Sequence, residues 1–374
     1  MFGGIASLCM IVYEQFFALL RAGLYPDLHL DLYLFPVGHT DWNTLFRLAK
    51  QQAVTGITFD GLSKLPVEYQ PDVKLKMQWY SFVVRIEQSN ELVNDRLCSL
   101  FSLYKSRGLN PVLLKGQGVA QNYPIPLHRQ CGDIDIYVGT QDFDKANCIA
   151  HELDIRDYEE GITEHHSHFK WQGVDVENHR IPAVLFGRKL IRSFNKHLKE
   201  WYPGLSQTAV IHTSDIAVPP AAFDAVFLFL HFYTHFVLNG VGIRQVCDWV
   251  MLLHKHRPFV TDVLGFDMEW QTFGYIAVRY LGLPEKEMPY YTDKYSDKAK
   301  RVVELILKDG NFGKNNTSVF LDRPQGYWSG KLFSFKYVLQ RLWKMLRIFP
   351  SSSLRYFFGY KLKMSIGTIL KDKL

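Results

Sequence analysis

The chain has 374 residues, 47% of them hydrophobic, 15% aromatic and 21% charged, and its formal net charge is +6. That length suits two or three packed units, and the composition is ordinary for a globular protein that buries a large core. The five cysteines are scattered without a CxxC pair, which excludes a disulfide framework or a zinc site and favours a reducing, cytoplasmic setting.

Residues 1–95 are predicted to be helical. Glu14 interrupts the apolar N-terminus before it reaches the roughly 20 residues that a membrane span needs, so we expect a helix packed on the body. Residues 41–54 have the apolar spacing of an amphipathic helix, carried by Trp42, Leu45, Phe46 and Ala49. A longer helix is predicted to follow Pro71 and to end at Gly108.

The pattern changes over residues 96–187, where strands and helices alternate. A short apolar run at 110–115 predicts a buried strand, and the alternation of polar and apolar residues at 133–138 predicts a strand with one wet face. A helix is expected over 142–153, and two further strands form a hairpin over 165–181. This order is typical of a compact α/β unit.

Residues 188–330 are predicted to be helical again. The clearest helices are 221–238 and 243–255, and a more charged helical region follows at 285–308.

Residues 331–374 form a basic tail. They hold ten Lys or Arg and one Asp, so their net charge of +9 leaves −3 for the rest of the chain. The slightly acidic body lacks a basic–aromatic strip, which argues against nucleic acid as a partner. Phe333 to Phe349 has the pattern of a basic amphipathic helix, which either packs on the body or binds an anionic membrane, an acidic partner or nucleic acid.

Two carboxylates lie close together on the predicted strand 133–138. Side chains two apart in a strand point the same way, so Asp133 and Asp135 share one face. Two negative charges this close need a neutralising partner, and a hard divalent cation, which prefers oxygen ligands, can neutralise them. Gly132 lets another group approach the backbone. An exposed acidic edge is the alternative explanation for the Asp pair alone.

A glycine turn precedes the Asp pair. Lys115, Gly116, Gln117 and Gly118 lie where a strand runs into a helix start, a place where free backbone N–H groups can hold phosphate. A purely structural turn is the alternative, but its position one helix before the paired-Asp strand favours phosphate binding.

The predicted hairpin separates polar from apolar side chains. With Gln172-Gly173 as a two-residue turn, the facing pairs are Trp171–Val174, Lys170–Asp175, Phe169–Val176, His168–Glu177, Ser167–Asn178 and His166–His179. One face then carries Lys170, Asp175, His168, Glu177, His166 and His179. Glu177 is the predicted third carboxylate of the site, and Asp175 is its rival. For His165, His166 and His168, contacts around the metal or with substrate are favoured over a transition-metal cluster, because no Cys partner accompanies them.

The order of these motifs closely resembles a bacterial family often described as uncharacterised nucleotidyltransferases, a branch of the polymerase-β-like superfamily. The resemblance spans most of residues 15–260 and rests on Leu-Leu-Lys-Gly at 113–116, Tyr-Pro at 123–124, Arg-Gln-Cys-Gly-Asp-Ile-Asp-Ile-Tyr-Val at 129–138, Val-Glu-Asn-His at 176–179 and Gly-Ile-Arg-Gln-Val-Cys-Asp-Trp at 242–249. It implies an α+β fold, in which a small mixed-sheet nucleotidyltransferase core is flanked by N-terminal and C-terminal helical regions. Gln117 replaces the usual Gly or Ser, and the turn lies farther before Asp133 than usual. These departures weaken the prediction of triphosphate binding more than that of the metal site.

The resemblance also implies two-metal catalysis with Mg²⁺, Mn²⁺ being the alternative ion. Asp133 and Asp135 would hold the metal that orients the triphosphate, and Glu177 would share a second metal that activates an acceptor hydroxyl. The glycine-turn amides, helped by Lys115 or Arg129, would offset charge on the departing pyrophosphate.

Two residue pairs in the C-terminal helices have open interpretations. His231 and His235 are either core histidines or contacts to the acceptor. Arg244 and Asp248 are either an ordinary helix ion pair or, because the family motif includes both, part of the cleft.

The predicted activity is transfer of a nucleoside monophosphate from a nucleoside triphosphate, with ATP the expected donor, to an unidentified hydroxyl acceptor. A small molecule or sugar is favoured over a protein side chain or an RNA end. The alternatives are kinase-like phosphoryl transfer and a non-catalytic nucleotide-binding or scaffold protein with a vestigial site. The expected location is the cytoplasm, or its membrane surface if the basic tail binds lipid.

Overall fold

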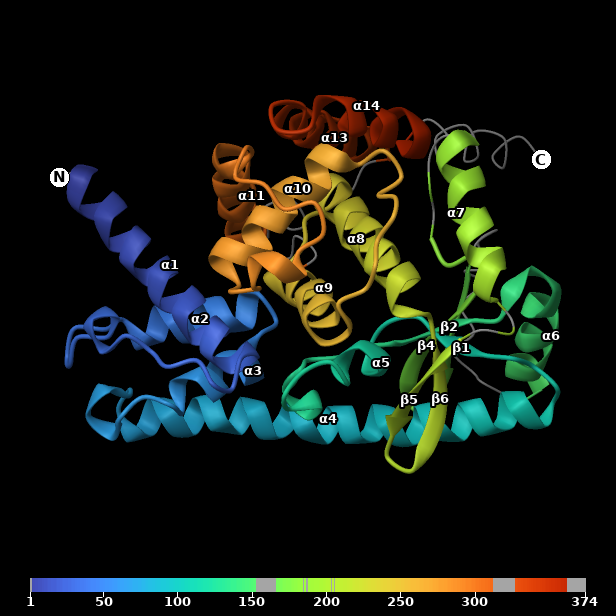
Figure 1. The fold of residues 1–374 in the computed structure, drawn as a ribbon, viewed down its shortest axis with the longest axis horizontal. Helices are drawn as coiled ribbons and strands as arrows, with labels where there is room; N and C mark the ends of the chain where they lie inside the picture. The colour runs from blue at the N-terminus through green and yellow to red at the C-terminus, as the bar shows by residue number, and fades with distance from the viewer. Residues whose placement is uncertain are drawn as a thin grey trace.

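The computed structural model describes residues 2–152, 166–183, 185, 188–202, 204, 206–311 and 327–361. Helices from both ends of the chain surround a small mixed sheet, so the predicted α+β class is confirmed (Figure 1). The predicted hairpin residue His165, the end of the predicted helix at Leu153 and the tail after Lys361 lie outside the described residues.

Three helices open the chain. They are α1 (Phe2–Leu24), α2 (Trp42–Gln51) and α3 (Thr55–Leu62), with 3₁₀ turns at Leu32–Leu34 and Val67–Tyr69. The four predicted apolar positions of α2 are buried. Helices α1 and α3 touch backbone to backbone, because a Cβ at Gly23 would lie 1.9 Å from the Ile57 carbonyl oxygen and one at Gly61 would lie 2.0 Å from that of Leu19. Only glycine permits this contact.

Helix α4 (Val73–Ser106) is 34 residues long and runs beneath the whole molecule (Figure 1). It begins where the Asp72 side chain accepts a hydrogen bond from the Leu75 N–H at 3.0 Å, and it is followed by Gly108, whose φ is +74°. Both ends agree with the prediction. Its first half contacts α2 and α3, and its second half lies under the sheet.

The main sheet has four strands in the order β1-β2-β4-β3. They are β1 (Val112–Leu113), β2 (Ile134–Tyr137), β3 (His166–Trp171) and β4 (Val174–His179). Strands β2 and β4 run parallel, and the other two pairings are antiparallel. The β3–β4 hairpin has the predicted register at all six positions. Gln172 and Gly173 both have positive φ, at +48° and +89°, as a tight two-residue turn requires.

The sheet has one apolar and one polar face. Its apolar face packs on the second half of α4 and on α6 (Gly139–Glu152), and the buried strand residues include Ile134, Ile136, Phe169, Val174 and Val176. The charged residues Asp135 and Glu177 therefore point to the opposite face, where α8 and α9 lie, whereas Asn178 lies on the apolar face and accepts a hydrogen bond from Tyr104 of α4.

A second, two-stranded sheet was not predicted. After α7 (Arg188–Trp201), β5 (Gln207–Ile211) and β6 (Ser214–Val218) form a hairpin inside the region expected to be helical throughout. Only the inward residues Ile211 and Ile216 are buried, so the strands lack the regular alternation that reveals a half-buried sheet. The ring of His212, at the turn, lies 2.7 Å from Glu91 of α4.

The remaining helices form the upper part of the molecule in Figure 1. They are α8 (Ala221–Leu238), α9 (Ile243–His256), α10 (Asp267–Tyr275), the π-helical turn η4 (Ile276–Tyr280), the 3₁₀ turn η5 (Glu285–Glu287), α11 (Ser296–Asp309), α13 (Tyr327–Leu346), α14 (Pro350–Tyr356) and the π-helical turn η7 (Phe357–Lys361). The predicted helical region at 285–308 is wrong in its first half, because only a single turn precedes Pro289 and the helix begins at Ser296.

Helix α8 is the central helix of the C-terminal half. By length and composition it could cross a bilayer, the one described helix of which this holds, but 67% of it is buried within the protein. Its aromatic residues Phe229, Phe232 and Tyr233 pack against Trp249 and Phe273. This is the environment of a core helix.

Candidate functional site

A cavity of about 430 Å³ lies between the polar face of the sheet and helices α8 and α9. The predicted site residues that line it are Lys115, Gly116, Arg129, Asp133, Asp135, His166, Glu177, His179, Arg244 and Asp248. Its volume is in the range of small-molecule and cofactor sites.

Asp135 and Glu177 form the centre of this site. They are direct neighbours in the parallel pairing of β2 with β4, so their side chains leave the sheet side by side. The Nε2 atom of His179 lies 3.0 Å from Asp135 Oδ1 and 3.3 Å from Glu177 Oε2. Ligand atoms of these three residues lie within 4.8 Å of one another, which is close enough to share one metal ion.

Lys115 brings a positive charge next to these carboxylates. Its Nζ lies 2.9 Å from Asp135 Oδ1 and 3.5 Å from Nε2 of His231. Burial alone would raise the pKa of Asp135, but the Lys115 ammonium and the hydrogen bond from His179 outweigh it and hold the pKa well below its usual value. The hydrogen bond from His179 likewise lowers the pKa of Glu177. Both carboxylates are therefore ionised at neutral pH.

Asp133 lies at the exposed edge of the cavity, one residue before β2. The neighbouring charge of Asp135 raises the pKa of Asp133, as expected for two carboxylates on one face. The glycine turn lies against this segment, since a Cβ on Gly116 would be 3.3 Å from the Asp133 carbonyl oxygen. Gly116 has a φ of +60°, so glycine suits both its conformation and this close approach.

The other predicted phosphate contacts differ in their positions. Gln117 is 2% exposed, and its amide donates to Asn90 of α4 at 3.2 Å, so its side chain does not line the cavity. Gly132 is exposed and has open space where a Cβ would be.

Arg129 lines the cavity but is held by a buried ion pair. Its Nε and Nη2 donate to the two carboxylate oxygens of Asp248, at 3.0 and 2.7 Å, and the Tyr123 hydroxyl donates to the same carboxylate at 2.7 Å. Asp248 therefore pairs with Arg129, and Arg244 instead donates to the carbonyl oxygen of Gln130 at 2.6 Å. The interpretation of Arg244 and Asp248 as an ordinary helix ion pair is wrong.

The hairpin residues divide between the cavity and the surface. His166 lines the cavity, with its ring centroid 5.7 Å from that of His179. His168 and Asp175 lie farther along the hairpin, 3.7 Å apart, and are not among the cavity-lining residues.

His231 and His235 of α8 form the wall opposite the carboxylates. Burial, together with the Lys115 charge, keeps the pKa of His231 well below its ordinary value and lowers that of His235 to about 4. Both rings are therefore neutral. A neutral ring allows His231 Nε2 to accept a hydrogen bond from Lys115. Asn239 and Gln245 also line the cavity; Gln245 belongs to the family motif at 242–249 but was not predicted as a site residue, and no motif included Asn239.

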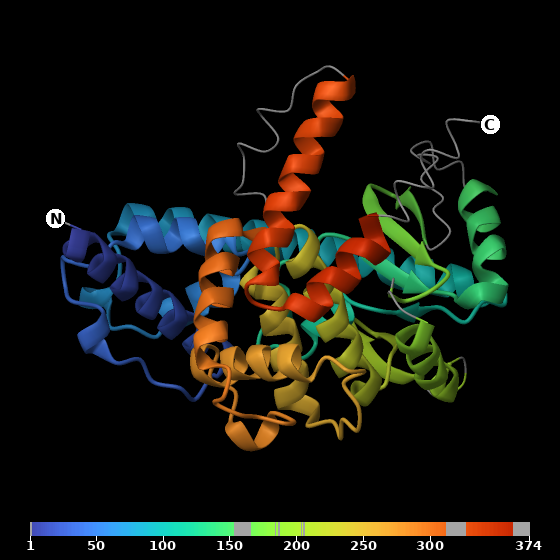
Figure 2. The ribbon, with the colours of Figure 1, turned by 90° about the horizontal axis from the view of Figure 1, so that it is seen from above.

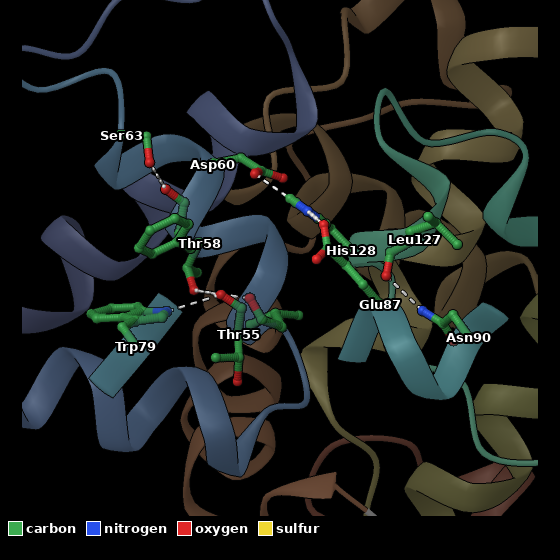
Figure 3. Close-up of polar contacts among 11 residues, drawn as sticks. Thr55, Thr58, Asp60, Ser63, Trp79, Glu87, Asn90, Leu127 and His128 are labelled. Carbon is green, nitrogen blue, oxygen red and sulfur yellow. Dashed lines mark hydrogen bonds and ion pairs between the residues drawn. The ribbon is translucent and has the colours of Figure 1, made fainter. Parts of the chain in front are cut away.

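The chain that leads into the site is fixed at His128 (Figure 3). Nδ1 of His128 lies 2.7 Å from Asp60 of α3, and Nε2 lies 2.9 Å from Glu87 of α4. Nearby, the Asn90 amide donates to the carbonyl oxygens of Leu127 and Arg129 at 2.6 and 2.9 Å. The N-terminal helices therefore hold the segment from which Arg129 and the Asp pair follow.

We expect His128→Gln to destabilise the protein by about 1–3 kcal/mol, the cost of breaking buried hydrogen bonds to charged groups. Burial acts to lower the pKa of His128, but Asp60 and Glu87 outweigh it and the pKa is raised. The stabilisation by protonated His128 is therefore complete below the unfolded pKa of about 6.5 and is lost as pH rises through the folded value. Urea unfolding of both proteins at several pH values should show a difference that shrinks with rising pH; a difference independent of pH would contradict this assignment.

Comparison with known proteins identifies a family. A family model described as "Uncharacterised nucleotidyltransferase" matches residues 38–270, which is more than half of the chain. The searches of curated proteins and of solved structures found no match. The matched range begins before α2 and ends in α10, so it includes every residue that lines the cavity. The chain therefore belongs to the uncharacterised nucleotidyltransferase family, and this membership supports a general nucleotidyltransferase activity.

Proposed function

We propose that the protein transfers a nucleoside monophosphate from a nucleoside triphosphate, ATP being the expected donor, to a hydroxyl group of a small molecule or sugar. The observation that carries this proposal is the pair Asp135 and Glu177, side by side on parallel strands and facing a cavity, with Asp133 at its edge. Carboxylates so arranged suit divalent metal ions that bind a triphosphate.

The surroundings of the carboxylates fit a cation. The Nε2 atom of His179 lies within hydrogen-bonding distance of both Asp135 and Glu177, and Lys115 contacts Asp135 from another side. The carboxylate pair thus has an environment that favours positive charge, and its oxygens would serve as ligands of a divalent cation. Asp133, Asp135 and Glu177 would hold Mg²⁺, with Mn²⁺ as the alternative, and a bound ion would offset phosphate charge and acidify the acceptor hydroxyl.

The proposed roles of the cations follow from their partners. Lys115 faces the cavity beside the carboxylates and would offset charge on the departing pyrophosphate. Arg129 keeps its guanidinium on Asp248, so its proposed role is to shape the cavity. Arg244 makes no ion pair among the described residues and is the second cation proposed to contact phosphate.

The remaining predicted residues are proposed to contact the substrates without a direct role in metal binding. We infer that the backbone of Gly116, Gln117 and Gly132, and not the Gln117 side chain, approaches the triphosphate. His166 and His179 border the cavity and are proposed to contact the substrates.

The reaction class is tested by following the α-phosphate and the γ-phosphate of the donor separately. The protein is incubated with Mg²⁺, a cell extract as source of acceptors, and ATP labelled on either the α- or the γ-phosphate. We expect the α-label to enter a new product while pyrophosphate is released. Release of nucleoside diphosphate, with the γ-label transferred, would establish kinase chemistry instead. No transfer of either label, with Mg²⁺–ATP binding retained, would favour a non-catalytic protein.

The third carboxylate is tested by two matched changes on β4. Glu177→Gln should lower transfer by at least about a hundredfold, because a metal contact contributes several kcal/mol and each factor of ten corresponds to about 1.4 kcal/mol. Asp175→Asn should change the rate by less than about threefold, since its side chain lies outside the cavity lining. The measurement is the initial rate of pyrophosphate release, and the reverse ranking would assign the role to Asp175.

A further inference from the structure

The last described helices form a surface that lacks acidic residues. From Tyr327 to Lys361 the chain has seven Lys or Arg and no Asp or Glu. Arg341 is turned inward, where it pairs with Asp309 of α11 and donates to the Phe236 carbonyl oxygen of α8. It anchors α13 to the body, and the other positive charges of this region are not used in that anchor.

Several of those charges are exposed beside large apolar side chains. Lys336, Lys344, Arg347 and Arg355 are exposed. Between them lie four exposed apolar residues: Leu339 at 41%, Trp343 at 62%, Leu354 at 41% and Phe358 at 56%. Leu339 and Trp343 are spaced by four and lie on one side of α13, and Arg347 follows in the turn directly after the helix ends. The Arg347 guanidinium lies 5.3 Å from the centre of the Trp343 ring.

The other face of the same helices is packed on the protein. Met345, Ile348, Phe349 and Tyr356 are buried, and the Phe349 and Tyr356 rings contact Tyr233 of α8. Figure 2 shows α13 projecting from the body, with α14 beside its base. The buried side chains thus hold the two helices in place. The exposed residues Leu339, Trp343, Lys344, Arg347, Leu354 and Phe358 are together called the basic–apolar face.

We propose that this basic–apolar face binds the surface of a membrane that contains anionic lipid. Exposed Lys and Arg are attracted to the negative surface, and their long side chains can reach the headgroups while Trp343 inserts at the interface. Leu339 and Leu354 favour lipid over nucleic acid. Cations and stacking aromatic rings contribute to nucleic-acid binding, whereas exposed aliphatic side chains contribute to binding a lipid interface.

The proposal is independent of catalysis. The cavity-lining residues His231 and His235 lie on the sheet side of α8, whereas Tyr233 and Phe236 contact Phe349 between α13 and α14, and Tyr233 also contacts Tyr356 of α14. A membrane on the basic–apolar face would therefore leave the cavity-side residues of α8 untouched, and vesicle binding can be measured without any substrate.

The test is co-sedimentation of the full chain with vesicles of phosphatidylcholine alone or mixed with phosphatidylglycerol, at low and high salt. We expect binding to the anionic vesicles to be at least about tenfold tighter than to the neutral ones and to weaken with salt. The triple variant Trp343→Ser, Lys344→Glu, Arg347→Glu should lose at least about tenfold in affinity. A matched variant on α4, Lys74→Glu, Lys76→Glu, Tyr80→Ser, carries the same charge change and should bind as the unmodified protein does.

Quenching by lipids brominated on their acyl chains provides a second readout that needs no charge reversal. We expect the brominated lipids to quench part of the tryptophan fluorescence of the unmodified protein. This part of the quenching should be absent in Trp343→Phe, which would identify Trp343 as the inserted residue. The proposal is overturned if neutral and anionic vesicles bind equally, if neither binds, or if both triple variants lose binding alike. Retention of oligonucleotides by this face, with no vesicle binding, would assign it to nucleic acid instead.

Discussion

Asp135→Asn is expected to reduce nucleotidyl transfer by about a thousandfold or more while the protein stays folded. Asp135 is 1% exposed and contacts both Lys115 and His179, so its charge is held at the centre of the site. The substitution keeps the shape of the side chain but removes the charge that a metal ion needs. Loss of several kcal/mol of charge stabilisation corresponds to a factor of this size.

The measurement is single-turnover transfer from α-labelled ATP, with Mg²⁺ at saturation. Asp215→Asn is the matched control, because Asp215 is an exposed strand carboxylate of β6 and the change of charge is identical. Its rate should equal that of the unmodified protein. Binding of Mn²⁺, followed by electron paramagnetic resonance, gives a readout apart from activity and should weaken in Asp135→Asn alone. Retention of more than a tenth of the rate would remove Asp135 from the catalytic centre.

The largest expected effect on stability comes from Asp248→Ala. The substitution leaves the buried Arg129 guanidinium without its carboxylate and the Tyr123 hydroxyl without its acceptor. Burial alone would raise the pKa of Asp248, but the Arg129 charge outweighs it and the net pKa is lowered, so the pair is ionised at neutral pH. Removing one partner of a buried ion pair costs about 3–5 kcal/mol. Denaturant unfolding at neutral pH measures this loss.

The double variant Arg129→Met, Asp248→Leu distinguishes a buried charge from lost packing. Replacing both partners by apolar residues leaves no unpaired charge, so most of the lost stability should return. Asp215→Ala serves as the surface control and should change the free energy of unfolding by less than about 0.5 kcal/mol. If Arg129→Met and Asp248→Ala each cost under about 1 kcal/mol, the ion pair is not a determinant of the fold.

The parts of the structure that were predicted from sequence are those specified by local pattern. The β3–β4 register followed from a two-residue turn and from the strict separation of polar and apolar side chains on either side of it. Helix α8 has its predicted bounds because Pro220 precedes it and an Asn-Gly pair follows it. The cavity then brought Asp133, Asp135 and Glu177 to one place, although their chemical roles stay a prediction.

What the sequence left open depends on contacts between distant segments. His231 reaches Lys115 across 116 positions, and the pair His231 and His235 did not by itself show that this face of α8 meets the sheet, because Phe and Leu surround the two histidines. Arg129 and Asp248 are 119 positions apart, and the nearer Arg244 was the obvious local partner. Gln117 turned toward Asn90 for a similar reason, since the position of α4 is not encoded in the glycine turn.

Helix α4 limits how this protein can be divided or recombined. Its residues Glu87 and Asn90 hold the segment before the Asp pair, while its last turns support the sheet. A fragment that began near residue 96 would cut the helix in the middle and lose Glu87 and Asn90 with it. The family match, which starts at residue 38, likewise includes α2, α3 and all of α4. The family unit is therefore larger than the four-stranded sheet, and grafting that sheet onto another scaffold would have to include this helix.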